Sequence, residues 1–362
     1  MNPIPKPGVL AIAPYIGTRA DPGVRLHQLS ANESALGPSP AAIEAFHAAA
    51  RGLHLYPDGG ANILRRVIGE RHGLNPDHIV CGNGSDELLS LLSHAYLRPD
   101  DEVVFSEHAF LIYRIATLAN DATPVIVPEP ELRVDVDQLV ARVTAKSRIV
   151  FLANPNNPTG TYLSGQELHR LHAGLPTHTL FVIDAAYAEF VQREDYEAGI
   201  ELVSRFDNVV MTRTFSKAYG LAGLRVGWAF CPGAVADVLN RVRGPYNVSV
   251  AAQAAAAAAM DDRAYLDRAI AHNETWRQWV ATEIRKLGLR VDEGVANFVL
   301  VHFSQQGARN AKAADEFLLK HGVALRPVGA YGLPHCLRLT IGLEEANRVA
   351  VEALSEFMKA TA

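Results

Sequence analysis

The sequence between residues 60 and 250 alternates short apolar runs with amphipathic stretches, and no other feature constrains the fold as strongly. The apolar runs are HIVCG, DEVVFSE, SRIVFLANP, TLFVID, NVVMTRT and RVGWAFC, with stretches such as DELLSLLSHAYL, LIYRIATLAN and GQELHRLHAG between the first four. Near-continuous apolar runs of this kind are typical of strands that are covered on both faces. We therefore predict an α/β fold in which helices cover a mostly parallel sheet in three layers.

The pattern changes near Val250. The run AAQAAAAAAM and the segment 261–288 look helical, and NFVLVHF, CLRLTIG and a closing stretch EEANRVAVEALSEFMKA predict a smaller α+β domain. The chain has 362 residues, which exceeds what one hydrophobic core usually serves. We expect an N-terminal arm at 1–40 that joins the small domain, a large domain at 41–250 and a small C-terminal domain at 251–362. The alanine run is interpreted as a tightly packed helix face.

The charge pattern argues for a small-molecule ligand. The formal net charge is −5, and Lys and Arg residues are interspersed with acidic residues. The sequence thus has no basic footprint for nucleic acid or for an anionic membrane. No stretch of about 18 apolar residues occurs, and the first residues, MNPIPKPGVLAIAPYIG, contain four prolines and no cleavable apolar core. We expect a cytoplasmic protein without a nucleic-acid or membrane partner.

The cysteines do not suggest a structural framework. Cys81, Cys231 and Cys336 lie far apart in the chain, and none belongs to a CxxC motif. This spacing argues against both a disulfide framework and a zinc site. We expect a reducing compartment and no bound metal.

Polar residues follow four of the apolar runs. They are NPNNPTG at 154–160, DAAY at 184–187, TFSK at 214–217 and the arginine of GLRVG, Arg225. Ligands of open α/β sheets bind outside the carboxyl ends of the strands. Taken singly, each motif has an ordinary explanation, since an aspartate after a strand is usually a turn or a helix cap and NPNNP is usually a turn.

Lys217 and Asp184 need a more specific explanation, because burial penalises the charged form of both side chains. Formation of an imine with an aldehyde gives a buried lysine a function, since a desolvated amine becomes a nucleophile near neutral pH. A protonated pyridine nitrogen would supply the cationic partner that a buried aspartate requires. Lysine, aspartate, asparagine and tyrosine together are the residue types that bind pyridoxal phosphate.

In this order and context, the motifs resemble those of the fold-type I, class II pyridoxal-phosphate-dependent aminotransferases, in particular the histidinol-phosphate aminotransferase family. The similarity extends from APYIG near the N-terminus to RPVGAYGLPHCLRLTIG near the C-terminus. The resemblance implies an aspartate aminotransferase-like fold with a large pyridoxal-phosphate-binding domain. It also implies that Lys217 holds the cofactor covalently, that Asp184 keeps the pyridine nitrogen protonated, and that Asn157 and Tyr187 bind the phenolic oxygen of the cofactor.

The cofactor phosphate requires a separate binding site. In GNGSDELL a predicted strand precedes Gly84 and Ser85 and a predicted helix follows, so their backbone amides can face an anion at a helix N-terminus. By resemblance, Ser216 and Arg225 are further phosphate ligands, and Thr214 is a weaker candidate. No Walker A pattern is present, so GNGSD is not interpreted as a nucleotide loop.

Asp86 is the exception within this group. A carboxylate beside a phosphate should repel it, so a cap for a helix at 85–97 is an equally good interpretation of Asp86. Two aromatic residues complete the predicted cofactor site by resemblance. Phe110 would stack on the cofactor ring, at a position where many relatives have tyrosine. Tyr56 would reach the cofactor phosphate of a neighbouring subunit, which implies a homodimer with shared active sites.

Four residues are candidate substrate ligands. Arg338 lies within the strand CLRLTIG, where an unpaired guanidinium would be costly, and its fork suits a carboxylate or a phosphate. By resemblance, Arg338 binds the α-carboxylate of the amino donor and, with Arg326 and Tyr15, the substrate phosphate; Asn157 also contacts substrate. A surface salt bridge for Arg326 and core packing for Tyr15 are the structural alternatives.

The resemblance predicts a transaminase of histidine biosynthesis that interconverts L-histidinol phosphate and 2-oxoglutarate with imidazole acetol phosphate and L-glutamate. A broad aromatic aminotransferase shares the cofactor residues and is the main alternative. A phosphothreonine decarboxylase and a non-catalytic binding protein of the same fold are two more. The presence of both Lys217 and Asp184 argues against the last of these.

Overall fold

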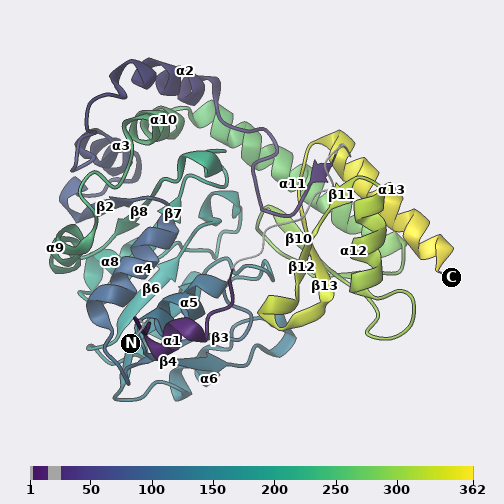
Figure 1. Cartoon of the computed structure of the whole chain (residues 1–362), viewed down its shortest axis with the longest axis horizontal. Coiled ribbons are helices and arrows are strands. Elements are labelled where there is room, and N and C mark those ends of the chain that lie inside the picture. The colour runs from purple at the N-terminus through teal and green to yellow at the C-terminus, as the bar shows by residue number, and fades with distance from the viewer. Residues whose placement is uncertain (1–2, 15–25, 362) are drawn as a thin grey trace.

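The computed structural model describes residues 3–14 and 26–361. Its larger unit, shown in Figure 1, is built on a seven-stranded sheet. The strand order is β2-β8-β7-β6-β5-β3-β4. Strands β3 to β7 pair in parallel, and β8 is antiparallel to both of its neighbours. The strands are β2 (Ile79–Gly82), β3 (Glu102–Ser106), β4 (Thr123–Val127), β5 (Ser147–Ala153), β6 (Leu180–Asp184), β7 (Val209–Thr214) and β8 (Gly227–Phe230). The prediction of a mostly parallel sheet is confirmed.

Helices cover both faces of this sheet. Along β6, Phe181 and Ile183 belong to one apolar cluster and Val182 to another, so alternate side chains enter two cores. The result is the three-layer α/β arrangement expected from the near-continuous apolar runs. The helices of this unit are α2 (Pro40–Ala49), α3 (Asn62–His72), α4 (Ser85–Tyr96), α5 (Leu111–Ala119), α6 (Val136–Ala141), α7 (Gly165–Ala173), α8 (Ile200–Arg205), α9 (Gly233–Val242) and α10 (Val250–Asp261), with the short α1 (Pro7–Leu10) against α5.

A second, smaller unit lies toward the C-terminus (Figure 1). Its four-stranded sheet has the order β12-β13-β10-β9, and all of its pairs are antiparallel. Its elements are β9 (Arg290–Val291), β10 (Phe298–His302), β12 (Arg326–Val328), β13 (Leu333–Thr340), α12 (Ala311–Lys320) and α13 (Glu344–Ala360). β1 (His27–Gln28) pairs in parallel with β11 (Val323–Ala324), so a segment close to the N-terminus lies against this unit. The short 3-10 helices are η1 (Ala50–Gly52), η2 (Pro76–His78), η3 (Pro130–Leu132), η4 (Ala188–Phe190), η5 (Ala222–Leu224) and η6 (Gly329–Tyr331).

The alanine run forms α10, which packs against α2 and α3. Ala252, Ala255 and Ala256 are fully buried and belong to the same core as the seven-stranded sheet. The small side chains let the helices approach closely, as expected for a packed helix face. The division into domains remains our proposal. This packing favours a boundary between the large and the small domain inside the long helix α11 (Arg263–Lys286) rather than at residue 250.

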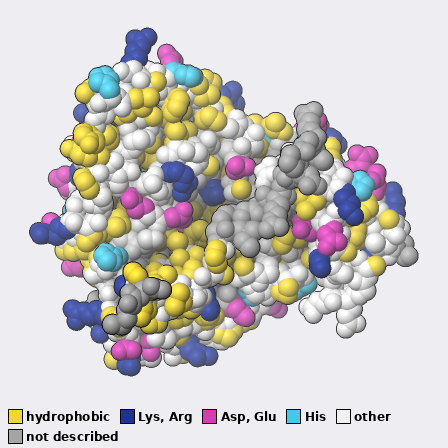
Figure 2. Space-filling model, in the orientation of Figure 1, with side chains coloured by type: hydrophobic (Ala, Val, Ile, Leu, Met, Phe, Trp, Pro, Cys, Tyr) yellow, Lys and Arg dark blue, Asp and Glu magenta, His cyan; other side chains and the backbone are white. Residues whose placement is uncertain are grey.

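Two further properties concern possible partners. On the face shown in Figure 2, Lys and Arg side chains are interspersed with Asp and Glu side chains. Within residues 3–14 and 26–361, no helix combines the length and apolarity needed to cross a bilayer.

Candidate active site

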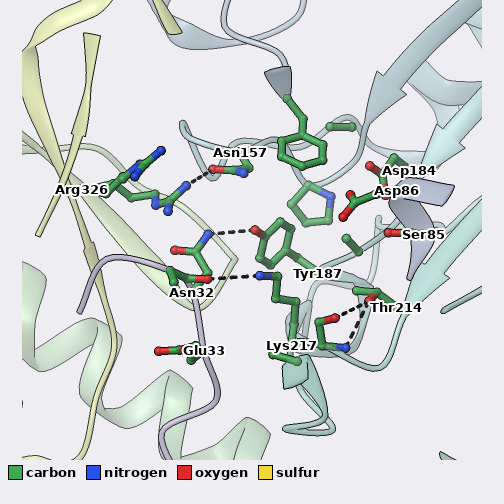
Figure 3. Close-up of a pocket in the computed structure, with 18 of the residues that line it drawn as sticks. Asn32, Glu33, Ser85, Asp86, Asn157, Asp184, Tyr187, Thr214, Lys217 and Arg326 are labelled. Atoms are coloured by element: carbon green, nitrogen blue, oxygen red, sulfur yellow. Dashed lines mark hydrogen bonds between the residues drawn. The ribbon is translucent and has the colours of Figure 1, made fainter. Parts of the chain in front are cut away.

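A cavity of about 450 Å³ opens at the carboxyl ends of the central strands, against the smaller unit. β5, β6 and β7 are adjacent and parallel, so Ala153, Asp184 and Thr214 end neighbouring strands on the same edge of the sheet. Figure 3 shows Asp86 and Asp184 on the side of the cavity away from Arg326, with Lys217 and Tyr187 between them. The predicted site residues that line the cavity are Ser85, Asp86, Phe110, Asn157, Asp184, Tyr187, Thr214, Ser216, Lys217, Arg225, Arg326 and Arg338.

Lys217 projects into this cavity from the loop after β7. Its Nζ donates a hydrogen bond to the carbonyl of Ala31 at 3.3 Å and lies 5.8 Å from the ring centroid of Tyr187. Burial, and then the positive charge of Arg338, lower the pKa of Lys217 to about 8. A substantial fraction of the amine is therefore neutral, and nucleophilic, near physiological pH.

The glycines after Lys217 allow a close approach of two loops. Gly220 has a φ of +71°, and a Cβ atom at this position would lie 2.2 Å from the carbonyl oxygen of Gly37. Only glycine fits such a position. The chain then returns through Arg225, so that its guanidinium donates to Ser216 Oγ at 3.3 Å.

Asp184 is buried at the end of β6. Its side chain accepts hydrogen bonds from the hydroxyls of Tyr113, at 3.0 Å, and Thr212, at 3.3 Å. Burial raises the pKa of Asp184 to about 6, and the hydrogen bond from Tyr113 partly opposes that rise. A buried carboxylate held by neutral hydroxyls suits a cationic ligand atom such as a protonated pyridine nitrogen.

The N-terminus of α4 and the loop after β7 form a cradle of anion-binding groups. Gly84, with a φ of +85°, precedes the helix, and a Cβ atom there would lie 2.5 Å from Arg225 Nη2. The hydroxyls of Thr214 and Ser216 are 3.0 Å apart. Backbone amides at a helix N-terminus, two hydroxyls and a guanidinium are suitable ligands for a phosphate.

Asp86 pairs with Arg225 in this cradle, where Arg225 Nη2 lies 3.1 Å from Asp86 Oδ2. The residue that caps α4 is Gly84, and its cap includes no side-chain hydrogen bond. The alternative of Asp86 as the capping residue is therefore wrong. Its charge still lies in the first turn of α4, where the helix dipole favours an anion.

Asn157 and Tyr187 are connected to the smaller unit and to the N-terminal segment. Tyr187 Oη accepts a hydrogen bond of 2.8 Å from Asn32 Nδ2, and Asn157 Oδ1 accepts one from Arg338 Nη1. Burial raises the pKa of Tyr187, so its hydroxyl stays protonated at neutral pH. Both polar groups are thus held in place facing the cavity.

Arg338 and Arg326 face each other across the β12–β13 pair. Arg338 is 5% exposed, donates from Nη2 to the Ser30 carbonyl at 2.7 Å, and has no hydrogen-bond partner for Nε among the described residues. Like charges directly opposite one another on a strand pair repel and are destabilising. Their position on the cavity wall fits an anionic group of a ligand.

The remaining predicted aromatic residues are Phe110, Tyr56 and Tyr15. Phe110 lines the cavity immediately before α5 and lies edge-on to Tyr113, with ring centroids 6.0 Å apart. Tyr56 is 82% exposed, stacks on Tyr246 at 4.6 Å, and does not line the cavity of its own chain. Tyr15 lies outside the described residues.

Several residues that shape the site were not identified from the sequence. They are Tyr113, Thr212 and Asn32, which hydrogen-bond to Asp184 or Tyr187. Thr212 lies two residues before Thr214 on the same strand face, so strand alternation could have identified it. Tyr113 and Asn32 come from other elements, and no local pattern connects them to the strand ends.

Taken together, these groups fit pyridoxal phosphate: an amine of lowered pKa, a buried carboxylate for a cationic nitrogen, and a phosphate cradle. The family model for aminotransferase class I and II matches residues 25–354. The chain belongs to this family and is a pyridoxal-phosphate-dependent aminotransferase.

Within the family, similar curated proteins include histidinol-phosphate aminotransferases. That of Rhodopseudomonas palustris strain BisB18 is 54% identical over 99% of both chains, and that of strain TIE-1 is 53% identical over the same share. A crystal structure of histidinol-phosphate aminotransferase from Sinorhizobium meliloti with pyridoxal-5'-phosphate has a TM-score of 0.88 at 29% identity, over 93% of this chain and 92% of the other. Aspartate aminotransferase from Thermus thermophilus, at 24% identity and a TM-score of 0.83 over 92% of each chain, shares the fold.

Proposed function

We propose that this enzyme interconverts L-histidinol phosphate and 2-oxoglutarate with imidazole acetol phosphate and L-glutamate, as a step of histidine biosynthesis. The observation that carries the proposal is the pair of arginines, Arg326 and Arg338, on the cavity wall. The cofactor cradle at Arg225 accounts for one phosphate, and the charge of this second cationic site suits an anionic group of the substrate. The names of the 54% and 53% identical relatives support the same substrate.

Pyridoxal phosphate, when bound, supplies an electron sink that stabilises negative charge at the carbon bearing the amino group. In our proposal Lys217 holds the cofactor and, once released by the incoming amine, takes the proton from that carbon of the substrate. Its pKa of about 8 suits a base at neutral pH, because a neutral fraction is present and the protonated form can return the proton.

The other residues of the site would hold the cofactor and orient it. Asp184 would keep the pyridine nitrogen protonated, while the hydroxyls of Tyr113 and Thr212 fix the direction of the carboxylate. Tyr187 and Asn157 would bind the phenolic oxygen, with Asn32 and Arg338 orienting them. The cofactor phosphate would lie against Gly84, Ser85, Thr214, Ser216 and Arg225, with Phe110 stacking on the ring.

The same arginines would serve both half-reactions. Arg338 would bind the α-carboxylate of glutamate in one half-reaction and would share the substrate phosphate with Arg326 in the other. Tyr15 is proposed as a third phosphate ligand on the basis of the family resemblance alone. A two-step exchange with one residue set gives ping-pong kinetics.

A single-turnover experiment tests the substrate. The purified yellow enzyme is mixed with histidinol phosphate, and separately with phenylalanine, and the loss of cofactor absorbance is followed. Fast conversion with histidinol phosphate alone supports the proposal. Comparable rates with both amines would instead indicate a broad aromatic aminotransferase, and release of carbon dioxide from phosphothreonine would indicate the decarboxylase.

We further propose a homodimer with shared active sites. An exposed apolar group supports it, made of Leu53, Leu55 and Tyr56 in one segment, Ile63 at the beginning of α3, and Tyr246, which stacks on Tyr56. A second copy of the chain would cover this group and bring Tyr56 to the neighbouring cofactor phosphate. We also propose a cytoplasmic location, which suits three free and buried cysteines.

A further inference from the structure

A cluster of metal-ligand side chains lies in the smaller unit. His302 ends β10, and His335 and Cys336 lie near the beginning of β13. One nitrogen of each histidine and the Sγ of Cys336 all lie within 4.8 Å of one another. The cysteine spacing had argued against a zinc site, but that argument considered cysteine pairs alone, and here the antiparallel pairing of β10 with β13 sets His302 directly opposite Cys336.

We propose that His302, His335 and Cys336 bind a thiophilic divalent cation such as zinc. The distance from His302 Nδ1 to Cys336 Sγ is 3.3 Å. Two such ligands on one tetrahedral zinc ion, with a Zn–S bond near 2.3 Å and a Zn–N bond near 2.0 Å, stand roughly 3.5 Å apart. The existing separation is therefore close to what coordination requires. On binding, the cation replaces the thiol proton between sulfur and nitrogen, and that proton leaves to solvent.

Asp292 orients one of these ligands. Its Oδ2 contacts His302 Nε2, the ring nitrogen that points away from Cys336. A carboxylate on the far nitrogen of a histidine fixes the proton there and leaves Nδ1 as a lone pair for a metal. Asp292 also forms an ion pair of 2.8 Å with Arg290. The positive charge of Arg290 near the proposed cation site is therefore balanced by a carboxylate.

The burial of the cluster suits a site with one open side. Cys336 is 1% exposed, whereas His302 and His335 are partly exposed, so a cation can enter from the histidine side. Three protein ligands leave the fourth tetrahedral position for water. A bound cation would join β10 to β13 and, through Asp292, to the segment after β9, and so would stabilise the smaller unit.

The test uses the cofactor-loaded enzyme after removal of free cofactor and metal. Co²⁺ is added, and the absorbance difference from the metal-free enzyme is recorded. We expect a thiolate-to-cobalt charge-transfer band that saturates at one ion per chain and is displaced by Zn²⁺. The band reports this cluster, because Cys336 is the only cysteine in a candidate metal-ligand group among the described residues, and neither Cys81 nor Cys231 lines the active-site cavity.

Variants assign the ligands. Cys336→Ser should abolish the band, and His335→Gln, at a more exposed position that tolerates substitution, should weaken Zn²⁺ binding by at least about tenfold. Asp292→Asn should weaken it by roughly tenfold while the band remains, as expected for a positioning residue. The matched control is His178→Gln, an exposed histidine outside the cluster, which should change neither property.

Two results would overturn the proposal. One is the absence of a thiolate band at saturating Co²⁺ in the parent enzyme. The other is Zn²⁺ binding of equal affinity in the parent, Cys336→Ser and His335→Gln, which would place the ion on other residues. Neither outcome depends on transaminase activity, so this test is independent of the proposed function.

Discussion

The hydroxyl of Tyr113 donates a hydrogen bond of 3.0 Å to Oδ2 of Asp184, from a helix on one face of the sheet to the end of a central strand. Tyr113 is fully buried and stacks on Phe151 with ring centroids 4.7 Å apart. Its position is therefore set by the apolar core. Through this bond the core determines the direction of the carboxylate that we propose as the partner of the cofactor nitrogen.

Tyr113→Phe should weaken cofactor binding. The hydrogen bond from Tyr113 lowers the pKa of Asp184, so its loss moves that pKa further above about 6 and leaves less carboxylate at neutral pH. Loss of a hydrogen bond to a charged group costs about 1.5 kcal/mol or more, so we expect roughly tenfold weaker binding of pyridoxal phosphate. Titration with pyridoxal phosphate measures the dissociation constant. The difference in affinity between the variant and the parent should shrink above pH 8. Tyr96→Phe is the control, because Tyr96 packs against the same apolar cluster that contains Tyr113. Equal affinity in Tyr113→Phe and the parent would contradict this role.

Lys217→Met should abolish turnover and stabilise the cofactor-free protein at neutral pH. In the parent, burial lowers the pKa of Lys217 from 10.5 to about 8, so the folded state binds fewer protons than the unfolded state between these values. The charged lysine thus opposes folding most below pH 8, and this penalty declines as the pH rises from 8 to 10.5. Urea unfolding of both cofactor-free proteins should show a gain for the variant at pH 7 that shrinks over that window. A gain that does not depend on pH would indicate a packing effect instead.

Asp184→Asn should separate stability from catalysis. The variant cannot hold a protonated pyridine nitrogen, and we expect turnover to fall roughly 100- to 1,000-fold, as for loss of a key electrostatic group. Burial raises the pKa of Asp184 from 3.8 to about 6, so its ionised form opposes folding above that range. The cofactor-free variant should gain stability over the parent as the pH rises from 4 to 6, and the gain should then stay constant. An unchanged kcat would refute the catalytic role.

Arg326→Ala should discriminate between substrates. We expect kcat/KM for histidinol phosphate to fall roughly 10- to 100-fold, because a charge-assisted contact with the phosphate is lost. Phenylalanine has no phosphate, so its kcat/KM should change little. Arg326→Lys keeps the charge but not the planar fork. Its kcat/KM for histidinol phosphate should lie between the values for the parent and for Arg326→Ala. An equal loss for both amines would remove Arg326 from phosphate recognition.

Mixed dimers test the shared site. Tyr56→Ala removes the group that we propose to act in the neighbouring subunit, and Lys217→Ala removes the group that acts in its own. If both chains are unfolded together, refolded at equal concentration and reloaded with cofactor, half of the dimers are mixed and each has one intact site. Activity should then reach roughly a quarter of that of the parent. The proposed arrangement would be contradicted if the refolded mixture were no more active than the sum of the two variants refolded separately. Parent enzyme that is refolded in the same way is the control.

Local patterns in the sequence were sufficient to predict the three-layer sheet and the residues at its strand ends. Near-continuous apolar runs indicate strands buried on both faces, and the residue that ends such a run must lie at the edge of the sheet. Asp184, Thr214 and Lys217 could therefore be assigned to one site before any contact between them was known. The roles of Phe110, Arg326 and Arg338 came from the family resemblance, and the structure brings these residues into the same cavity.

Contacts between elements that are distant in the sequence could be established only from the tertiary structure. The bond from Tyr113 to Asp184, the opposition of Arg326 and Arg338, and the meeting of His302 with Cys336 all join residues on different elements. The packing of α10 with the large sheet is of the same kind. The physical reason is that periodicity reports which face of an element is buried, whereas the partner of that face depends on strand register and on how helices pack. Local sequence patterns are therefore enough to assign the elements and the edge of the sheet that carries the site, whereas strand register and helix packing establish which side chains meet there.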